Sequence, residues 1–204
     1  MRRFFRVASI GLMVGAGGMA GLAQAEPVNG KTAKAMLFSP KAIDFRVVPQ
    51  KFLSPADIAA LRLIPMIMKK QGLPLKYYGA IAVAPARGLS GKETTLFAMG
   101  HHSVEAARKA ALAGCNAKRK GGKPCAIVAE VRPKGWEKRP LQLSRDATAG
   151  FRKYRRAGKP KAFAISPSSG EWAFARGADA ARKAISQCNA ATRGRNDCDV
   201  VIQD

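Results

Sequence analysis

Acidic residues and histidines are scarce in this chain, and the compact motifs of several enzyme classes are missing. Among 204 residues there are 13 aspartates and glutamates and two histidines, the adjacent His101 and His102. Zinc ligands are spaced differently, and no C-x-x-C pair is present, so we expect no metal site. The sequence also has no G-x-S-x-G, no H-E-x-x-H and no P-loop, and we predict neither a cofactor nor catalytic residues.

The run His101-His102-Ser103 is the one place where a base stands beside a nucleophile. Adjacent residues at the start of a helix rarely face one another, however, and Ser103 suits the N-cap position of the helix that follows. We therefore interpret these three residues as structural or surface residues, and we expect a protein that is not an enzyme.

Residues 1–25 have the three parts of a secretory signal peptide. The front carries Arg2, Arg3 and Arg6, residues 7–22 are uncharged, and Ala23-Gln24-Ala25 offers small side chains for cleavage. We expect export to the periplasm or the medium, by a route that the partial twin-arginine match leaves open. No cysteine follows the cleavage position and no second long apolar run occurs, so we expect neither a lipid anchor nor a transmembrane segment after leader removal.

The four cysteines form two pairs with the same spacing. Cys115 and Cys125 are ten positions apart, as are Cys188 and Cys198. An even cysteine count in an exported chain predicts disulfides, and local pairing is the simplest of three connectivities. Each bridge would close a short loop and contribute about 3 kcal/mol.

Most of the remaining chain is predicted to be two copies of one unit. The segment 106–117 matches 180–190, with an apolar strand before each and a β-branched strand after each cysteine pair. Local patterns predict the order helix, strand, strand, helix, disulfide loop, strand. We predict an α+β fold of two tandem repeats, packed as small antiparallel sheets with helices on one face. The expected divisions are a signal peptide at 1–25, a lead segment at 26–52, the first repeat at 53–135 and the second at 136–204.

The strand Gly79-Ala80-Ile81-Ala82, an alanine-rich helix ending at Cys115, and Cys125 before the last strand form a recurring pattern. With it the chain resembles a family of exported bacterial proteins that carry a short domain of unknown function. The second copy resembles it too, with Ala162-Phe163-Ala164-Ile165 and a shorter hairpin. The resemblance implies an exported α+β domain without an assigned reaction. Some chains of this kind are labelled 5-aminolevulinate synthase. The sequence does not support that label, because such enzymes resemble pyridoxal-phosphate folds more than twice as long.

Positive charge is the strongest functional signal. The predicted leader holds three arginines and no acidic residue, so its removal lowers the formal charge from +23 to +20. The segment from Lys118 to Lys161 alone contains 15 Lys+Arg and 3 Asp+Glu. Within it, Phe151 and Tyr154 lie near each other on a predicted helix as core or stacking groups. The predicted anion-binding residues are Arg152, Lys153, Arg155, Arg156, Lys159 and Lys161.

A basic surface of this kind attracts phosphates and other anions. The leading hypothesis is an exported, non-enzymatic protein that binds anionic lipid or polysaccharide of the cell envelope. Nucleic acid is a poorer candidate because export separates the protein from the genome. The alternatives are a solvated basic surface that only maintains solubility, a small exported enzyme with a site between the repeats, and a secreted cationic effector.

Overall fold

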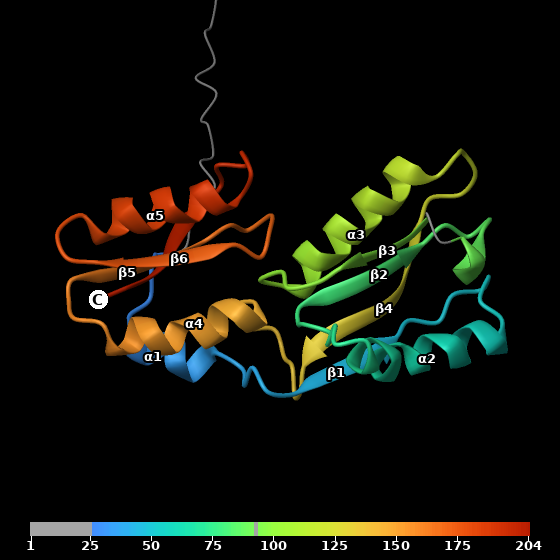
Figure 1. Ribbon diagram of the computed structural model, residues 1–204, viewed down its shortest axis with the longest axis horizontal. Coiled ribbons are helices and arrows are strands. Elements are labelled where there is room, and N and C mark those ends of the chain that lie inside the picture. The colour runs from blue at the N-terminus through green and yellow to red at the C-terminus, as the bar shows by residue number, and fades with distance from the viewer. Residues whose placement is uncertain (1–25, 92–93) are drawn as a thin grey trace, which may run out of the picture.

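The computed structural model describes residues 26–91 and 94–204, so the predicted signal peptide lies outside the described residues. Two halves lie side by side, each with one small sheet (Figure 1). The elements are α1 (Gly30–Met36), β1 (Ile43–Val47), α2 (Pro55–Lys70), β2 (Gly79–Val83), η1 (Gly88–Ser90), β3 (Thr95–Ala98), α3 (Val104–Lys118), β4 (Ala126–Pro133), α4 (Arg145–Arg156), β5 (Lys161–Ile165), β6 (Trp172–Arg176), α5 (Ala180–Ala191) and β7 (Asp199–Gln203).

The order of elements confirms the predicted α+β fold. We call residues 55–133 the first unit and residues 145–203 the second unit; each has the order helix, strand, strand, helix, strand. The sheet orders are β1-β4-β2-β3 and β6-β5-β7, and within each unit all strand pairs are antiparallel. Both central strands shift register at the matching position, between Ile81 and Ala82 and between Phe163 and Ala164. The units therefore share the position of a β-bulge as well as their topology.

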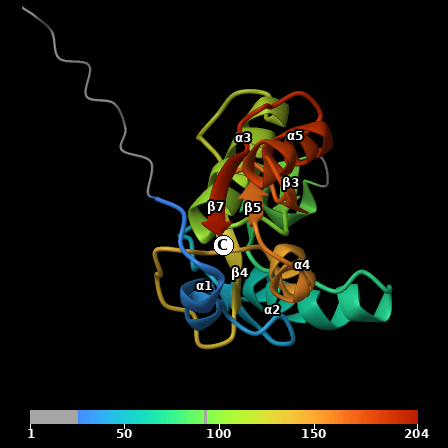
Figure 2. The same cartoon turned by 90° about the vertical axis from the view of Figure 1, so that its left-hand side faces the viewer.

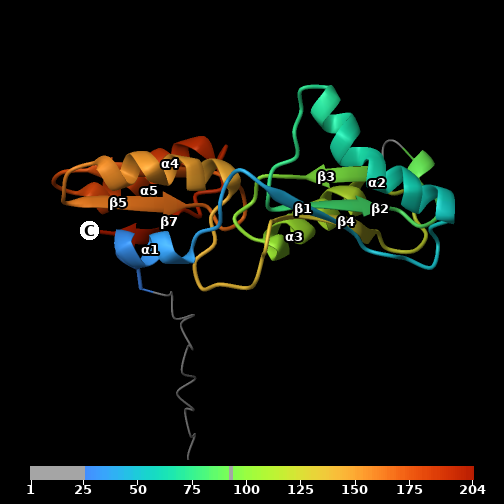
Figure 3. The same ribbon diagram turned by 90° about the horizontal axis from the view of Figure 1, so that it is seen from below.

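The placement of the helices corrects one part of the prediction. Instead of lying on one face, the two helices of each unit cover opposite faces of its sheet (Figure 1). Seen from below, α2 and α4 lie in front of the two sheets (Figure 3). The physical reason is that successive strand residues point to opposite faces, and every residue of β2 and β5 is buried. In β5, Ala162 and Ala164 face α5, whereas Phe163 and Ile165 face α4.

The lead segment belongs to both halves. Val28 bridges to Ile202 of β7, and Ala33 of α1 is buried in the core of the second unit. The chain then crosses to the first sheet, where β1 pairs with β4. Figure 2 shows α1 and α4 on the same side of the second sheet. The lead segment therefore contacts both units, although it precedes both of them in the sequence.

Both predicted disulfides are present, Cys115–Cys125 and Cys188–Cys198, with Cα–Cα distances of 6.1 and 6.0 Å. Two structural disulfides fit an oxidising compartment. Each cysteine on α3 and α5 is fully buried at the end of its helix. None of the helices in residues 26–91 and 94–204 is long and apolar enough to cross a membrane.

Serine side chains cap three of the helices, and the cap predicted at Ser103 is confirmed. Ser54 forms a capping box with Asp57, Ser103 accepts a bond from the amide of Ala106, and Ser144 accepts one from Ala147. Pro65 neither ends α2 nor removes its last turns, because the helix continues to Lys70.

Candidate anion-binding surface

His102 is buried at the junction between the two units. Its Nδ1 accepts a hydrogen bond from the amide of Ser144 at 3.0 Å, so Nε2 carries the proton and donates to the carbonyl of Glu171, also at 3.0 Å. Burial lowers the pKa of His102 to about 4. A Cβ on Gly170 would clash with the carbonyl of Gly100, so the backbones also meet closely here. The neutral imidazole therefore joins the first unit to the second.

The neighbouring residues do not form a catalytic arrangement. Ser103 is engaged as the cap of α3, and Nδ1 of His101 is buried without a hydrogen-bond partner. Burial lowers the pKa of His101, with a further contribution from Arg195. Within the described part of the chain, no three His, Cys, Asp or Glu residues could hold a metal ion together.

The predicted basic helix is α4, and its charged side is open to solvent. Phe151 and Tyr154 are buried, with their rings stacked at a centroid distance of 5.6 Å. They belong to the core of the second unit and are not a stacking platform for a ligand. On the opposite side lie four exposed side chains that we call the α4 basic face: Arg152, Lys153, Arg155 and Arg156.

The charges of the α4 basic face are not balanced by ion pairs within residues 26–91 and 94–204. None of its four side chains forms an ion pair with another described residue. Arg152 and Arg155 also line a groove of about 190 Å³ between α4 and the chain after α1, together with Lys34 and Phe38. A planar guanidinium donates several hydrogen bonds to phosphate or carboxylate oxygens. This surface can therefore take up anionic groups without breaking an existing ion pair.

The other two predicted anion-binding residues are placed differently. Lys159 is exposed, with its ammonium 3.7 Å from Asp204. Lys161 is buried, and its ammonium donates to the carbonyls of Ala157 at 3.0 Å and Arg155 at 3.4 Å. Lys161 therefore caps the end of α4 from within the protein, and we leave it out of the surface.

Asp204 lies close to the ammonium groups of Lys159 and Lys161 at this end of α4. Its carboxylate accepts hydrogen bonds from the amide of Gly30 at 3.2 Å and from the hydroxyl of Tyr154 at 3.0 Å. Partial burial raises the pKa of Asp204, but these bonds, with Lys159 and Lys161, bring it below its usual range. The ionised Asp204 satisfies Lys161 and leaves the α4 basic face positive.

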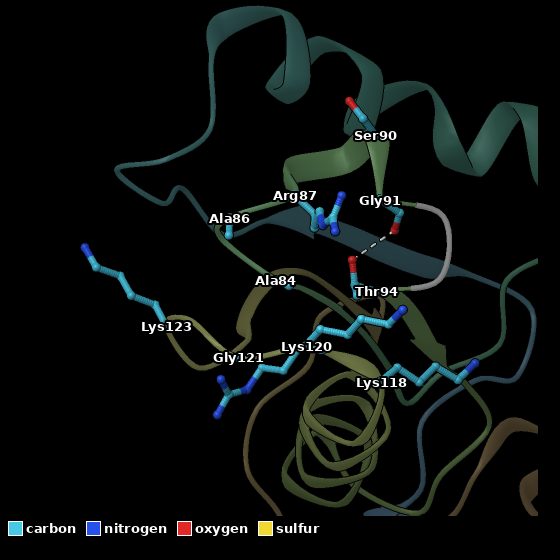
Figure 4. A pocket seen from close by; sticks show the side chains of 11 residues that line it. Ala84, Ala86, Arg87, Ser90, Gly91, Thr94, Lys118, Lys120, Gly121 and Lys123 are labelled. Carbon is cyan, nitrogen blue, oxygen red and sulfur yellow. Dashed lines mark hydrogen bonds between the residues drawn. The ribbon is translucent and has the colours of Figure 1, made fainter.

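A second basic region lies in the first unit, where sequence analysis did not place a site. Residues 84–91 and Thr94, which lie between β2 and β3, and the disulfide loop after α3 line a hollow of about 380 Å³, which we call the loop hollow (Figure 4). Its described lining contains no acidic residue. The cationic residues of the lining are Arg87, Lys118, Arg119, Lys120 and Lys123.

One of these cations supports the loop, and the others have no ion-pair partner in the described part of the chain. Arg119 donates to the side-chain oxygen of Asn116 at 2.8 Å and to the carbonyl of Gly122 at 2.5 Å. Arg87, Lys118, Lys120 and Lys123 are exposed and form no ion pair with a described residue. Figure 4 shows Arg87 and Lys120 beside the opening, while Lys123 extends away from them.

The sequence signal for the loop hollow is the run Lys118-Arg119-Lys120-Gly121-Gly122-Lys123. Its partner, Arg87, is about thirty positions earlier, so no local pattern connects the two. The backbone at Gly91 also passes close to neighbouring side chains, because a Cβ there would lie 2.5 Å from Oγ1 of Thr94.

Comparison of the chain with protein-family models, with curated proteins and with solved structures found no match. The resemblance to an exported bacterial family therefore stays a prediction from the sequence.

Proposed function

We propose that the mature protein is an exported, non-enzymatic binding protein, periplasmic or secreted, that attaches to anionic material of the cell envelope. The attachment surface is the α4 basic face. The observation that supports this proposal is that four exposed cations share one side of a helix and have no ion-pair partner in the described chain. An unpaired cationic surface gains electrostatic energy from an anionic partner and loses no internal pair.

The rigidity of α4 supports the same proposal. Phe151, Tyr154 and Phe163 anchor the helix to the sheet through ring contacts, and the three rings are buried. A helix held in place presents its charges without a backbone ordering cost on binding. The signal-peptide pattern and the two disulfides support the proposed location.

The experiment is co-sedimentation of residues 26–204 with vesicles of phosphatidylglycerol and phosphatidylcholine, or of phosphatidylcholine alone. Binding to an anionic polysaccharide forms a second arm. We expect binding to the anionic vesicles that weakens as salt is raised from 50 to 500 mM. Changing Arg152, Lys153, Arg155 and Arg156 together to Gln should lower the partition coefficient about 100-fold or more, since each basic residue near an anionic bilayer contributes about 1 kcal/mol.

The matched control removes the same charge elsewhere. Lys51, Lys69, Lys70 and Lys109 are exposed and form no ion pair with a described residue, and all four become Gln in the control. The proposal predicts a clearly smaller loss for the control. Equal losses in both variants would show a general charge effect, and salt-independent or absent binding in both arms would end the proposal.

A further inference from the structure

The loop hollow of the first unit has a counterpart in the second unit. Both disulfides span ten positions, and both central strands carry their bulge at the matching step. The turns after those strands also match, because Arg87 donates its amide to the carbonyl of Ala84 as Ser169 does to Ser166. On this alignment Pro124 corresponds to Asp197, and Ala86 corresponds to Ser168.

In the second unit a carboxylate of the chain itself lies between the turn after the central strand and the disulfide loop. We call this position the joint. Asp197 accepts a hydrogen bond from the hydroxyl of Ser166 at 2.6 Å and another from the amide of Ser168 at 3.1 Å. Partial burial raises the pKa of Asp197, but the bonds from Ser166 and Ser168 bring it below its usual range. The turn and the disulfide loop of the second unit are therefore joined through an internal anion, and Arg195 adds a bond to the carbonyl of Ser168 at 3.0 Å.

In the first unit no described residue places a carboxylate at the same joint, and the described lining has a surplus of cations. Pro124 cannot supply an anion, and the corresponding space is the loop hollow of about 380 Å³. Arg87 and Lys120 lie at its opening (Figure 4). We propose that the loop hollow binds a phosphate group of an envelope component, in the place where the second unit holds its own Asp197 carboxylate. The inference rests on the proposed function, because it assigns an anionic ligand to a second site on the same protein.

Phosphate fits the lining better than a single carboxylate does. The four cations without a described ion-pair partner exceed what one carboxylate can neutralise, whereas a phosphate monoester carries up to two charges and three acceptor oxygens. The volume is at the lower end of the range for small-molecule sites, so it admits the phosphate with a little of the group that bears it.

The experiment is an NMR titration of isotope-labelled residues 26–204 with inorganic phosphate at constant ionic strength. We expect saturable amide shifts at Ala86 and Gly121 in the first unit. The corresponding amides of Ser168 and Gly194 in the second unit should not shift, because Asp197 occupies that joint. Absence of saturable shifts at the loop hollow, or equal shifts in both units, overturns the proposal.

One substitution transfers the internal anion from the second unit to the first. Pro124→Asp places a carboxylate at the position that Asp197 has in the second unit, and it should weaken phosphate binding at least tenfold. Pro124→Asn is the matched control, because it removes the proline ring without adding charge, and it should retain binding. Since Arg87 is exposed, Arg87→Gln offers a second variant that leaves the fold intact and should also weaken binding. If neither Pro124→Asp nor Arg87→Gln weakens binding, the site is wrong.

Two further arms identify the source of the phosphate. Glycerol phosphate represents a soluble ester, and vesicles containing phosphatidic acid represent a lipid headgroup. The probe that changes the amide signals of Ala86 and Gly121 identifies the source. The α4 variant described above separates this inference from the proposed function. If that variant loses vesicle binding but keeps the phosphate shifts, both sites stand; if wild type binds vesicles without shifts at the loop hollow, only the inference fails. If phosphate shifts the loop-hollow amides but no salt-sensitive binding through α4 is found, the proposed function fails and the phosphate site remains.

Discussion

The two units have the same order of elements but fill one side of their sheets with different side chains. On the sides that face α3 and α5, both use alanine, such as Ala82 and Ala164. On the opposite sides the first unit packs Ile81 and Val83, whereas the second packs Phe163 within a group of aromatic rings. The alanine side and the disulfide behind it therefore define the shared framework, and the other side is where the units differ.

The same contrast extends to their loops. Asn116 and Asn189 each accept a hydrogen bond at 3.0 Å from the amide of the second cysteine of their unit. Around this common contact, the first loop places Lys120 beside the loop hollow, while the second is joined to its hairpin by Asp197. The same asparagine–cysteine contact thus accompanies a cationic hollow in the first unit and, in the second, a turn and a loop joined by hydrogen bonds to Asp197.

The largest expected effect concerns the differing cores. Phe163→Ala should lower the free energy of unfolding by about 3 to 5 kcal/mol, and Ile81→Ala by about 2 to 5 kcal/mol. Phe163 stacks on Trp172 at a centroid distance of 5.2 Å and also contacts Tyr154 at 5.8 Å, so its removal should cost more. Urea unfolding measures both, with Phe163→Leu as the milder control. A smaller loss for Phe163→Ala than for Ile81→Ala would contradict the aromatic account of the second core.

The next effect concerns the junction between the units. His102 has a pKa of about 4 in the fold and an ordinary value of 6.5, so the unfolded chain binds the extra proton between these values. Stability is therefore fully present above pH 6.5 and decreases as the pH falls towards 4, by up to about 3 kcal/mol.

His102→Gln should reduce the pH dependence of the unfolding free energy between pH 6.5 and 4, and His101, whose pKa burial also lowers, accounts for part of what remains. Asp197 and Asp204 have lowered pKa values and act at lower pH, so the difference between wild type and variant isolates the imidazole. Equal slopes in the two proteins would show that His102 is not held neutral at the junction.

The smallest effect tests the shared frame of the two loops. Asn116→Ala and Asn189→Ala should each lower the free energy of unfolding by about 1 kcal/mol, because each leaves a cysteine amide without its acceptor. The first should lose slightly more, since Arg119 also donates to Asn116. Asn→Asp at either position keeps an acceptor oxygen and serves as the control. A loss in one unit alone would show that the two loops do not share this contact.

Much of the fold could be predicted because its signals are local. Ser54, Ser103 and Ser144 mark helix starts by their own hydrogen bonds, and the cysteine spacing predicts both bridges. The faces occupied by the helices could not be predicted, because β2 and β5 are apolar at every position. The division of the lead segment also escaped prediction, since the pairing of Val28 with Ile202 spans most of the chain.

The buried face of α5 shows how an alignment of two repeats can be wrong by one residue. Matching residues 106–117 to residues 180–190 from their first residues would place Ala181 and Ile185 on the buried face with Cys188, but the buried residues of α5 are Ala180, Ala184 and Cys188. The buried cysteine sets the rotation of the helix, so the alignment has to start from Cys188.

The basic side of α4 is visible in the sequence because its charges lie at helical spacing. The burial of Lys161 is not, because it depends on the end of α4 and on Asp204 coming together in the fold. The loop hollow was missed for the same reason, since Arg87 and Lys120 meet only through the strand pairing of β2, β3 and β4.

The contrast between the two loops is tested most directly by locating an anion in the mature protein. A crystal structure of residues 26–204 soaked with tungstate, a phosphate analogue with strong anomalous scattering, would show where it binds. We predict one peak in the loop hollow within hydrogen-bond distance of Arg87 or Lys120, and none beside Asp197. A peak at Asp197, or an empty loop hollow at a concentration that saturates the titration, would contradict the account.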